Sequence, residues 1–307
     1  MKKKALIISL NGTKLLKMEK ILLSKEKPWG VILFKRNLKS IKQIKKLTLN
    51  IRNLTKDKKF PIIIDEEGER VSRLRNVINH SLSASFFGKL YKKNKDFCSK
   101  TYKAYIFSLS KILKNLGINI NTIPVLDILR KNTTKVVGNR SFSNNRKIVK
   151  QMGKLTLKYL HTKQIAGIIK HIPGHGAAAV DSHKRLPKVQ LNLKQLNKID
   201  FYPFKLSNAK LAMTAHILYT KLDTNNAATL SKKIIKKIIR KKIGFKGILI
   251  SDDISMKALK YDLITNAQKS IEAGCNLVLY CEGKTNDNFK LIKSLPYIDK
   301  FTSKKTS

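Results

Sequence analysis

Short runs of β-branched and other apolar residues recur along the chain, separated by longer basic stretches with a helix-like pattern. Continuous apolar runs of this length are typical of strands buried on both faces, and the stretches between them are long enough for crossover helices. The runs occupy residues 5–10, 30–34, 61–65, 120–127, 166–171, 211–216, 247–253 and 276–281. Eight strands that alternate with helices predict a single-domain (β/α)₈ TIM barrel, with a doubly wound sheet as the alternative.

The two ends of the chain frame the expected domain. The barrel is predicted to occupy residues 1–300, and residues 301–307 are predicted to be a frayed C-terminal tail. The opening MKKKALIISL has a basic start, but its apolar stretch is too short for a secretory leader and predicts a first strand. Because no apolar run approaches the roughly 18–20 residues of a membrane span, we expect a cytoplasmic protein without membrane contact.

The charge of the chain is strongly basic. Lysine and arginine number 65 against 19 acidic residues, which gives a formal net charge of +46 and suggests a polyanionic partner. Only 10 of these residues are arginines, and the lysines are spread along almost the whole chain. We therefore favour a solvated basic surface and expect no specific nucleic acid partner, although a basic nucleic-acid-binding protein is the alternative from another functional class.

The cysteines and the strand ends indicate where chemistry is to be sought. Cys98, Cys275 and Cys281 are odd in number and lack CxxC spacing, so neither a disulfide framework nor a zinc site is indicated. Polar residues instead end four of the predicted strands, namely Asp65, Lys170 with His171, His216, and Asp252 with Asp253. In a parallel barrel these ends lie on one face, where active sites are built.

Two of these strand ends are acidic. In IIIDEEGERVSRLR (62–75), Asp65 could accept hydrogen bonds from hydroxyls while Arg70 and Arg73 donate to oxygens, the alternative being a turn before a charged helix start. In ILISDDISM (248–256), adjacent strand residues point to opposite faces, so only one of Asp252 and Asp253 can face the barrel mouth. That carboxylate is a candidate nucleophile or base, and the other is expected to cap a helix or hold a loop.

The stretch KHIPGHGAAAVDSH (170–183) contains three of the six histidines. His171 and His175 have the spacing of metal ligands on a helix, but proline and glycines between them oppose a helix. A phosphate-binding turn lacks the P-loop spacing. The third interpretation is a flexible loop in which Asp181 orients His183 and raises its basicity for proton transfer.

These segments together resemble a known family. The stretch KHIPGHG…VDSH, with IDEEGERV, GNRSF, MTAHI and GFKGILISDDISM, resembles the bacterial β-N-acetylglucosaminidases of glycoside hydrolase family 3 over roughly residues 5–285. The resemblance implies a single (β/α)₈ barrel that removes N-acetylglucosamine from peptidoglycan fragments in the cytoplasm, with retention of configuration. It further implies a monomer that needs no cofactor and no metal.

The resemblance also implies roles for individual residues. Asp252 matches the nucleophile, His183 the general acid/base and Asp181 its partner. The residues at the positions that grip the sugar are Asp65, Arg73, Arg140, Lys170 and His171. A carboxylate nucleophile with a proton donor is what retaining glycoside hydrolysis requires, and a histidine donor departs from the usual second carboxylate. A related exo-glycosidase or a glycoside phosphorylase is the alternative among enzymes.

The chain departs from the family pattern at two places. The usual EGGR reads EGER, so Glu69 stands where the family has glycine, beside Asp65. Between His175 and Asp181 the sequence GAAAV lacks the polar residues often found there. We expect these changes to affect the loop near Asp65 and the docking of the catalytic loop, since neither removes a catalytic group.

Overall fold

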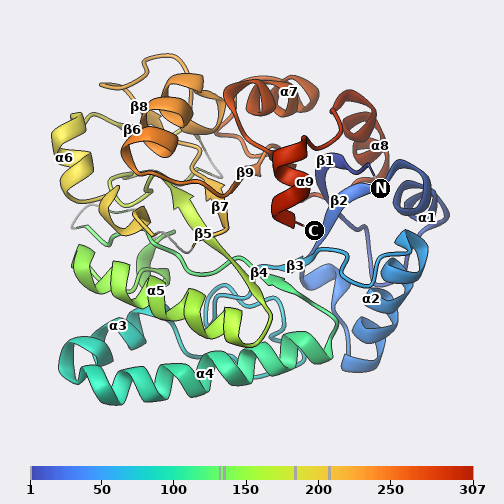
Figure 1. Ribbon diagram of the computed structural model, residues 1–307, viewed down its shortest axis with the longest axis horizontal. Coiled ribbons are helices and arrows are strands. Elements are labelled where there is room, and N and C mark those ends of the chain that lie inside the picture. The colour runs from blue at the N-terminus through green and yellow to red at the C-terminus, as the bar shows by residue number, and fades with distance from the viewer. Residues whose placement is uncertain (1, 131–132, 134–135, 183–184, 207–208, 307) are drawn as a thin grey trace.

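A closed parallel barrel forms the centre of the molecule (Figure 1). The computed structural model describes residues 2–130, 133, 136–182, 185–206 and 209–306. Around the barrel the strands follow one another in chain order, and every neighbouring pair is parallel. They are β1 (Lys4–Ser9), β2 (Pro28–Leu33), β3 (Ile62–Ile64), β4 (Ile120–Asn121), β5 (Ala166–Ile172), β7 (Leu211–Thr214), β9 (Ile248–Asp253) and β10 (Leu277–Leu279). The predicted (β/α)₈ barrel is confirmed.

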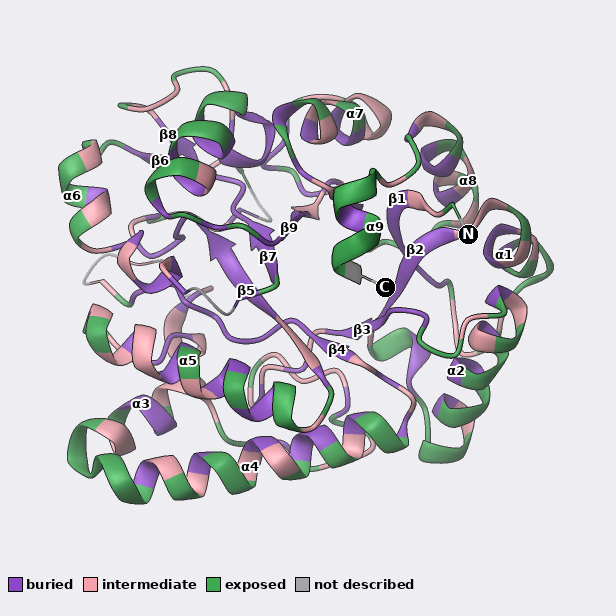
Figure 2. Ribbon diagram, viewed as in Figure 1, coloured by how far each residue is buried: buried purple, intermediate pink, exposed green. Residues whose placement is uncertain are grey.

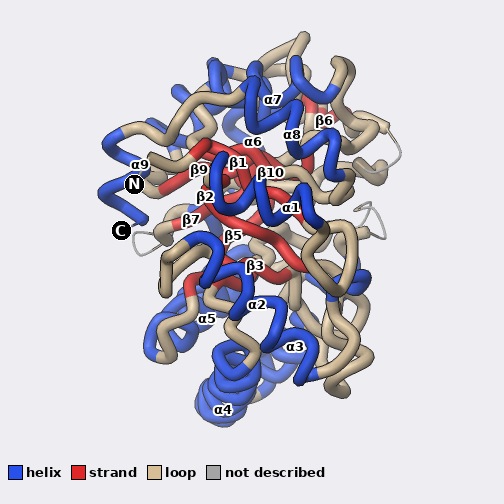
Figure 3. Tube along the Cα trace, turned by 90° about the vertical axis from the view of Figure 1, so that its right-hand side faces the viewer, coloured by secondary structure: helices blue, strands red, loops and turns tan. Residues whose placement is uncertain are grey.

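Helices connect the strands and cover the outside of the barrel (Figure 3). The α-helices are α1 (Lys17–Ile21), α2 (Ile41–Thr55), α3 (Ala84–Lys93), α4 (Lys95–Asn115), α5 (Arg146–Thr162), α6 (Leu193–Lys198), α7 (Leu263–Ala273), α8 (Thr285–Ser294) and α9 (Lys300–Thr306). Shorter or π-helical turns are η1 (Leu22–Glu26), η2 (Lys35–Asn37), η3 (Gly138–Arg140), η4 (Tyr202–Phe204), η5 (Ala228–Leu230) and η6 (Ile234–Lys242). None of the helices in the described part of the chain is long and apolar enough to cross a membrane.

The strands divide their side chains between two cores. Inward-facing residues such as Ile7, Ile63, Ile168 and Ile250 fill the barrel, while their neighbours pack between the sheet and the helices. The strands are buried almost throughout, whereas each outer helix exposes one face (Figure 2). The continuous apolar runs in the sequence therefore reflect burial on both faces of each strand.

Two features differ from the expected pattern. Residues 301–306, expected to be a frayed tail, lie in α9, where Thr302 is buried and accepts a hydrogen bond from Asn276 (3.1 Å). Outside the barrel, β6 (Lys188–Val189) and β8 (Leu218–Tyr219) form a small parallel pair that follows β5 and β7. These strands were too short to be recognised as apolar runs.

Candidate active site

A cavity of about 480 Å³ opens at the carboxyl ends of the barrel strands, the size of a small-molecule site. It is lined by Asp65, Arg73, Arg140, Lys170, His171 and Asp252, all predicted site residues, together with further polar and apolar side chains. The sequence therefore located six members of one cavity, from four separate segments of the chain.

The strand-borne members of the site continue the inward-facing rows of the barrel core. Ile63 is followed two residues later by Asp65, Ile168 by Lys170 and Ile250 by Asp252, and each later residue lines the cavity. Side chains alternate between the two faces of a strand, so the residue two positions beyond an interior residue points the same way. The polar residues at the strand ends thus form the layer above the apolar interior.

Asp65 lies at the centre of a charged cluster. Lys170 Nζ and Arg73 Nη2 both lie 2.5 Å from its carboxylate oxygens, and the Thr122 hydroxyl also donates to it. Lys170 donates in addition to Thr122 Oγ1 (2.8 Å). Burial raises the pKa of Asp65, but the charges of Lys170 and Arg73 outweigh burial and hold it well below its usual range. Asp65 is therefore ionised at neutral pH.

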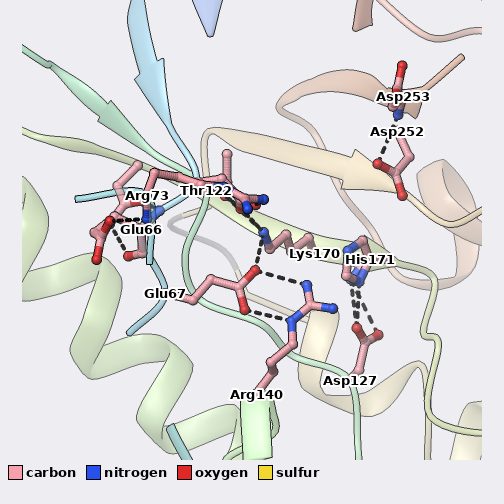
Figure 4. Close-up of polar contacts among 12 residues, drawn as sticks. Glu66, Glu67, Arg73, Thr122, Asp127, Arg140, Lys170, His171, Asp252 and Asp253 are labelled. Carbon is pink, nitrogen blue, oxygen red and sulfur yellow. Dashed lines mark hydrogen bonds and ion pairs between the residues drawn. The ribbon is translucent and has the colours of Figure 1, made fainter. Parts of the chain in front are cut away.

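Glu67 forms ion pairs with two cations that line the cavity, Arg140 and Lys170. It receives a bidentate contact from Arg140, with Nε to Oε2 at 2.7 Å and Nη2 to Oε1 at 2.9 Å, and lies 2.5 Å from Lys170 Nζ (Figure 4). Burial lowers the pKa of Arg140, but the charge of Glu67 raises it above its ordinary value. A fork-to-fork pair of this kind fixes the direction of the guanidinium as well as its charge.

Asp127 is fully buried and contacts His171 and His175, two of the three histidines of the 170–183 stretch. Its Oδ2 lies 2.6 Å from His171 Nδ1, and its Oδ1 accepts the His175 amide N–H at 2.6 Å. Burial raises the pKa of Asp127, but the neighbouring His171 and His175 lower it overall. For His175, burial outweighs the charge of Asp127 and lowers the pKa to about 4.

Asp252 and Asp253 both line the cavity, against the expectation that only one would face it, but their carboxylates have different surroundings. Asp253 accepts from the N–H and hydroxyl of Ser255 (3.1 and 2.8 Å) and from the Cys281 N–H (3.2 Å), so its carboxylate holds the strand end and the following loop. Asp252 accepts from the Asp253 N–H (2.9 Å), and its carboxylate points the opposite way, toward the side where Lys170 and His171 lie (Figure 4).

The electrostatic environment of the two aspartates also differs. Burial raises the pKa of Asp252, but His216, His171, the Asp253 amide and Lys170 bring it below the ordinary value. For Asp253, burial outweighs its hydrogen bonds and raises the pKa. Asp252 therefore ionises more readily than Asp253, and a carboxylate nucleophile must be ionised.

A buried network supports the segment that carries Asp65 and Arg73. Glu66 is fully buried and accepts from the N–H groups of Arg73 (2.7 Å) and Leu74 (2.9 Å), while His80 contacts its other oxygen. Glu69 lies in this segment with φ of +38°, a left-handed conformation that is uncommon for residues other than glycine. Its backbone remains engaged, because its N–H donates to the His80 carbonyl (2.8 Å).

The remaining predicted residues, Asp181 and His183, follow β5 in the sequence. Asp181 is half-buried and precedes Ser182, which lines the cavity. His183 lies outside the described residues, so its contact with Asp181 stays a prediction. Asp127 and Glu67 were missed as site residues. Asp127 ends the apolar run 120–127, so the strand-end criterion that found Asp65 would also have found it.

Comparison with known proteins identifies the family. Residues 4–301 match the model of the glycosyl hydrolase family 3 N terminal domain. A β-hexosaminidase of Nitrosomonas eutropha is 32% identical over 281 residues, which cover 90% of this chain and 80% of the relative. A β-hexosaminidase of Neisseria meningitidis serogroup A is 34% identical over 258 residues, covering 82% and 71%.

A solved structure agrees over nearly the whole chain. NagZ from Neisseria gonorrhoeae, in complex with N-trifluoroacetyl-D-glucosamine, superposes with a TM-score of 0.90 at 30% identity, covering 99% of this chain and 89% of that one. The cavity at the strand ends thus occurs in a barrel shared with these enzymes. The chain belongs to glycoside hydrolase family 3 and is a glycoside hydrolase of the β-hexosaminidase type.

Proposed function

We propose that the protein is a retaining exo-β-N-acetylglucosaminidase that releases N-acetylglucosamine from peptidoglycan fragments in the cytoplasm. The observation that carries this proposal is the placement of Asp252, an anionic carboxylate that faces the same cavity as the cluster around Asp65 and Lys170. The β-hexosaminidase relatives and the glucosamine derivative bound to gonococcal NagZ support the choice of sugar.

Asp252 acts as the nucleophile in the proposed reaction. Its carboxylate oxygen forms a bond to the anomeric carbon while the glycosidic C–O bond breaks and the leaving oxygen takes a proton from His183. Water then attacks the glycosyl-aspartate, with His183 accepting a proton from it, and the Asp252 carboxylate is released. Two inversions at the anomeric carbon give net retention.

The charged cluster binds the sugar in this scheme. Asp65 accepts from hydroxyls, while Arg73, Arg140, Lys170 and His171 supply donors or an imidazole nitrogen. Arg73 and Lys170 pair with Asp65, while Arg140 is held by Glu67 and His171 by Asp127, so the site is preorganised and its dipoles need little reorientation on binding. Asp181 orients the His183 imidazole and stabilises its charged form.

The substrate assignment is tested by comparing hydrolysis of an aryl N-acetyl-β-glucosaminide with that of the matching aryl β-glucoside. We expect a clear preference in kcat/KM for the N-acetylated sugar, and a preference for the glucoside would overturn the assignment. Chromatography of isolated disaccharide-peptide fragments, before and after incubation with the enzyme, then tests the peptidoglycan substrate.

The chemistry is tested by product analysis. Proton NMR at early times should show the β-anomer of the released sugar, and the product should be the free sugar whether or not phosphate is present. Release of a sugar 1-phosphate in phosphate buffer would instead identify the related phosphorylase. Mass spectrometry of enzyme quenched during turnover should locate an added glycosyl group on the peptide that contains Asp252.

A further inference from the structure

Asp127 contacts two parts of the site at once and is assigned no role by the proposed reaction. It is fully buried and does not line the cavity, whereas His171, on which it acts, does. Oδ2 contacts the His171 ring, and Oδ1 faces the backbone N–H groups of His175 (2.6 Å) and His171 (3.3 Å). One carboxylate therefore links a proposed sugar-binding side chain to the backbone of the following loop.

The contact with His171 fixes the protonation pattern of its ring. A carboxylate only accepts hydrogen bonds, so the nitrogen that faces Asp127, Nδ1, must carry a proton. Burial raises the pKa of Asp127, but His171 and His175 lower it overall, so the side chain is ionised at neutral pH. In the neutral imidazole, Nε2 on the other side of the ring is then an acceptor available to a ligand in the cavity.

The contact with His175 fixes the start of the loop that leads to Asp181 and His183. The same turn packs closely on the segment after Asp127, because a Cβ at Gly176 would lie 2.2 Å from the Ile128 carbonyl oxygen. His175 in turn contacts Ser182 (Nε2 to Oγ, 3.4 Å). The turn is thus held by contacts of both the backbone and the imidazole ring of His175.

From this geometry we propose that Asp127 is a positioning residue with two separable functions. Through Oδ2 it holds the His171 ring with the proton on Nδ1 and Nε2 available to the sugar. Through Oδ1 it anchors the loop that carries the proton donor. The roles of His171 and of the loop rest on the proposed glycosidase function, while the protonation pattern of the ring can be measured without turnover.

The substitution Asp127→Asn separates the two functions. The His175 N–H faces Oδ1 at 2.6 Å, while the His171 N–H lies at similar distances from both oxygens (3.3 and 3.4 Å). We therefore expect the amide oxygen of asparagine to take the Oδ1 position and its NH₂ to face His171 Nδ1. The imidazole must then accept at Nδ1 and carry its proton on Nε2. The loop anchor is kept, but the tautomer of His171 is inverted.

Long-range ¹H–¹⁵N NMR of the imidazole rings reads this tautomer directly. The chain has six histidines, and the His171 signals are assigned by comparison with His171→Gln. We expect the proton on Nδ1 in the native protein at pH 8 and on Nε2 in Asp127→Asn. Asp223→Asn serves as the matched control, since Asp223 also accepts backbone N–H groups but lies outside the cavity. A proton on Nε2 of His171 in the native protein would overturn the proposal.

Kinetics test the consequence for the reaction. Asp127→Asn should lower kcat/KM about 10–100-fold, by similar factors for natural fragments and activated aryl glycosides, because only sugar binding is affected. Asp127→Ala also releases the loop, so it should show a further loss on natural fragments, which need the proton donor. Equal behaviour of the two variants on both substrates would overturn the anchoring function. Inactivity of the native protein would refute the proposed function, while the NMR result would still decide the role of Asp127.

Discussion

The cavity residues fall into two groups, a strand side carried by barrel strands and a loop side carried by irregular segments. On one side Asp65, Lys170 and Asp252 extend the inward-facing rows of the barrel strands, so the sheet itself sets their direction. On the other side Arg140 and the loop after β5 reach the cavity from irregular segments, and buried partners such as Glu67 and Asp127 hold them. The first side is positioned by strand register and the second by ion pairs and hydrogen bonds.

This difference predicts how each side responds to substitutions. A strand-borne residue can lose its charge and keep its place, because the backbone that carries it is buried in the barrel. A loop-borne residue depends on a charged partner, and removal of that partner leaves an unpaired buried charge. Substitutions on the strand side should therefore change chemistry or binding alone, and those on the loop side should change stability as well.

The largest effect is expected at Asp252, on the strand side. Asp252→Ala removes the only carboxylate that we place as nucleophile, so kcat should fall by about 10⁴–10⁶-fold with little change in the melting temperature. Asp253→Ala is the matched comparison, since it removes hydrogen bonds to Ser255 and Cys281 and should mainly lower stability. Near-native kcat in Asp252→Ala would move the nucleophile elsewhere, with Asp253 as the next candidate.

The next effect concerns His183, the proposed proton donor. His183→Ala should lose about 10²–10⁴-fold in kcat on natural disaccharide fragments, whose alkoxide leaving groups need a proton. An activated nitrophenyl substrate should form the glycosyl-enzyme far less impaired and then accumulate it, because water lacks its base. Asp181→Asn should show a weaker version of this pattern. Burst and steady-state kinetics on both substrates measure it, and equal losses on both would assign His183 to binding.

Two arginines compare the partners of the two sides, because Arg73 pairs with Asp65, which follows β3 directly, and Arg140 pairs with Glu67. Arg73→Ala and Arg140→Ala should each raise KM, since losing a charged hydrogen bond costs about 1.5–3 kcal/mol. Asp65 keeps Lys170 and Thr122 after loss of Arg73, so stability should change little. Loss of Arg140 removes the bidentate partner of buried Glu67 and leaves it only Lys170, so it should also lower the free energy of unfolding, by at most about 3–5 kcal/mol. Equal unfolding midpoints in urea would contradict this distinction.

The same division explains how far the sequence could predict the molecule. Apolar runs located all eight barrel strands, because burial on both faces leaves a strong signal, and the strand-end residues followed from them. The strand-end criterion applies to Asp127 as well, but the partners of Glu67 and Asp127, namely Arg140 and His171, lie 73 and 44 residues away, and no local pattern reports such contacts. The tail helix α9 was missed because its docking depends on Thr302 and Asn276, far apart in sequence.

His175 should give the loop side a distinct dependence on pH. Its folded pKa of about 4 lies below the unfolded value of 6.5, so the unfolded chain binds more protons between these values. Stability from this group is therefore complete above pH 6.5 and falls by up to about 1.4 kcal/mol per unit as pH decreases toward 4. The carboxyl groups with lowered pKa, Asp65 and Asp252, lose their contribution only below about pH 4.

Urea unfolding of the native protein and His175→Gln between pH 7.5 and 4.5 measures this contribution. We expect the free energy of unfolding to fall less steeply with decreasing pH in the variant. Parallel curves for the two proteins would show that His175 takes up its proton equally well in the folded and unfolded states.

The smallest effect is expected at Glu69, where a left-handed backbone carries a side chain in place of the family glycine. A left-handed conformation costs an ordinary residue about 1–2 kcal/mol, while glycine adds about 0.4–1 kcal/mol of unfolded-state entropy. Glu69→Gly should therefore raise the free energy of unfolding by about 0.5 kcal/mol. Its backbone hydrogen bond to His80 can be kept, so kcat/KM should stay within about twofold. Lys56→Gly, at φ of +52° after α2, is the control away from the cavity, and destabilisation by Glu69→Gly alone would reveal a contribution of the Glu69 side chain.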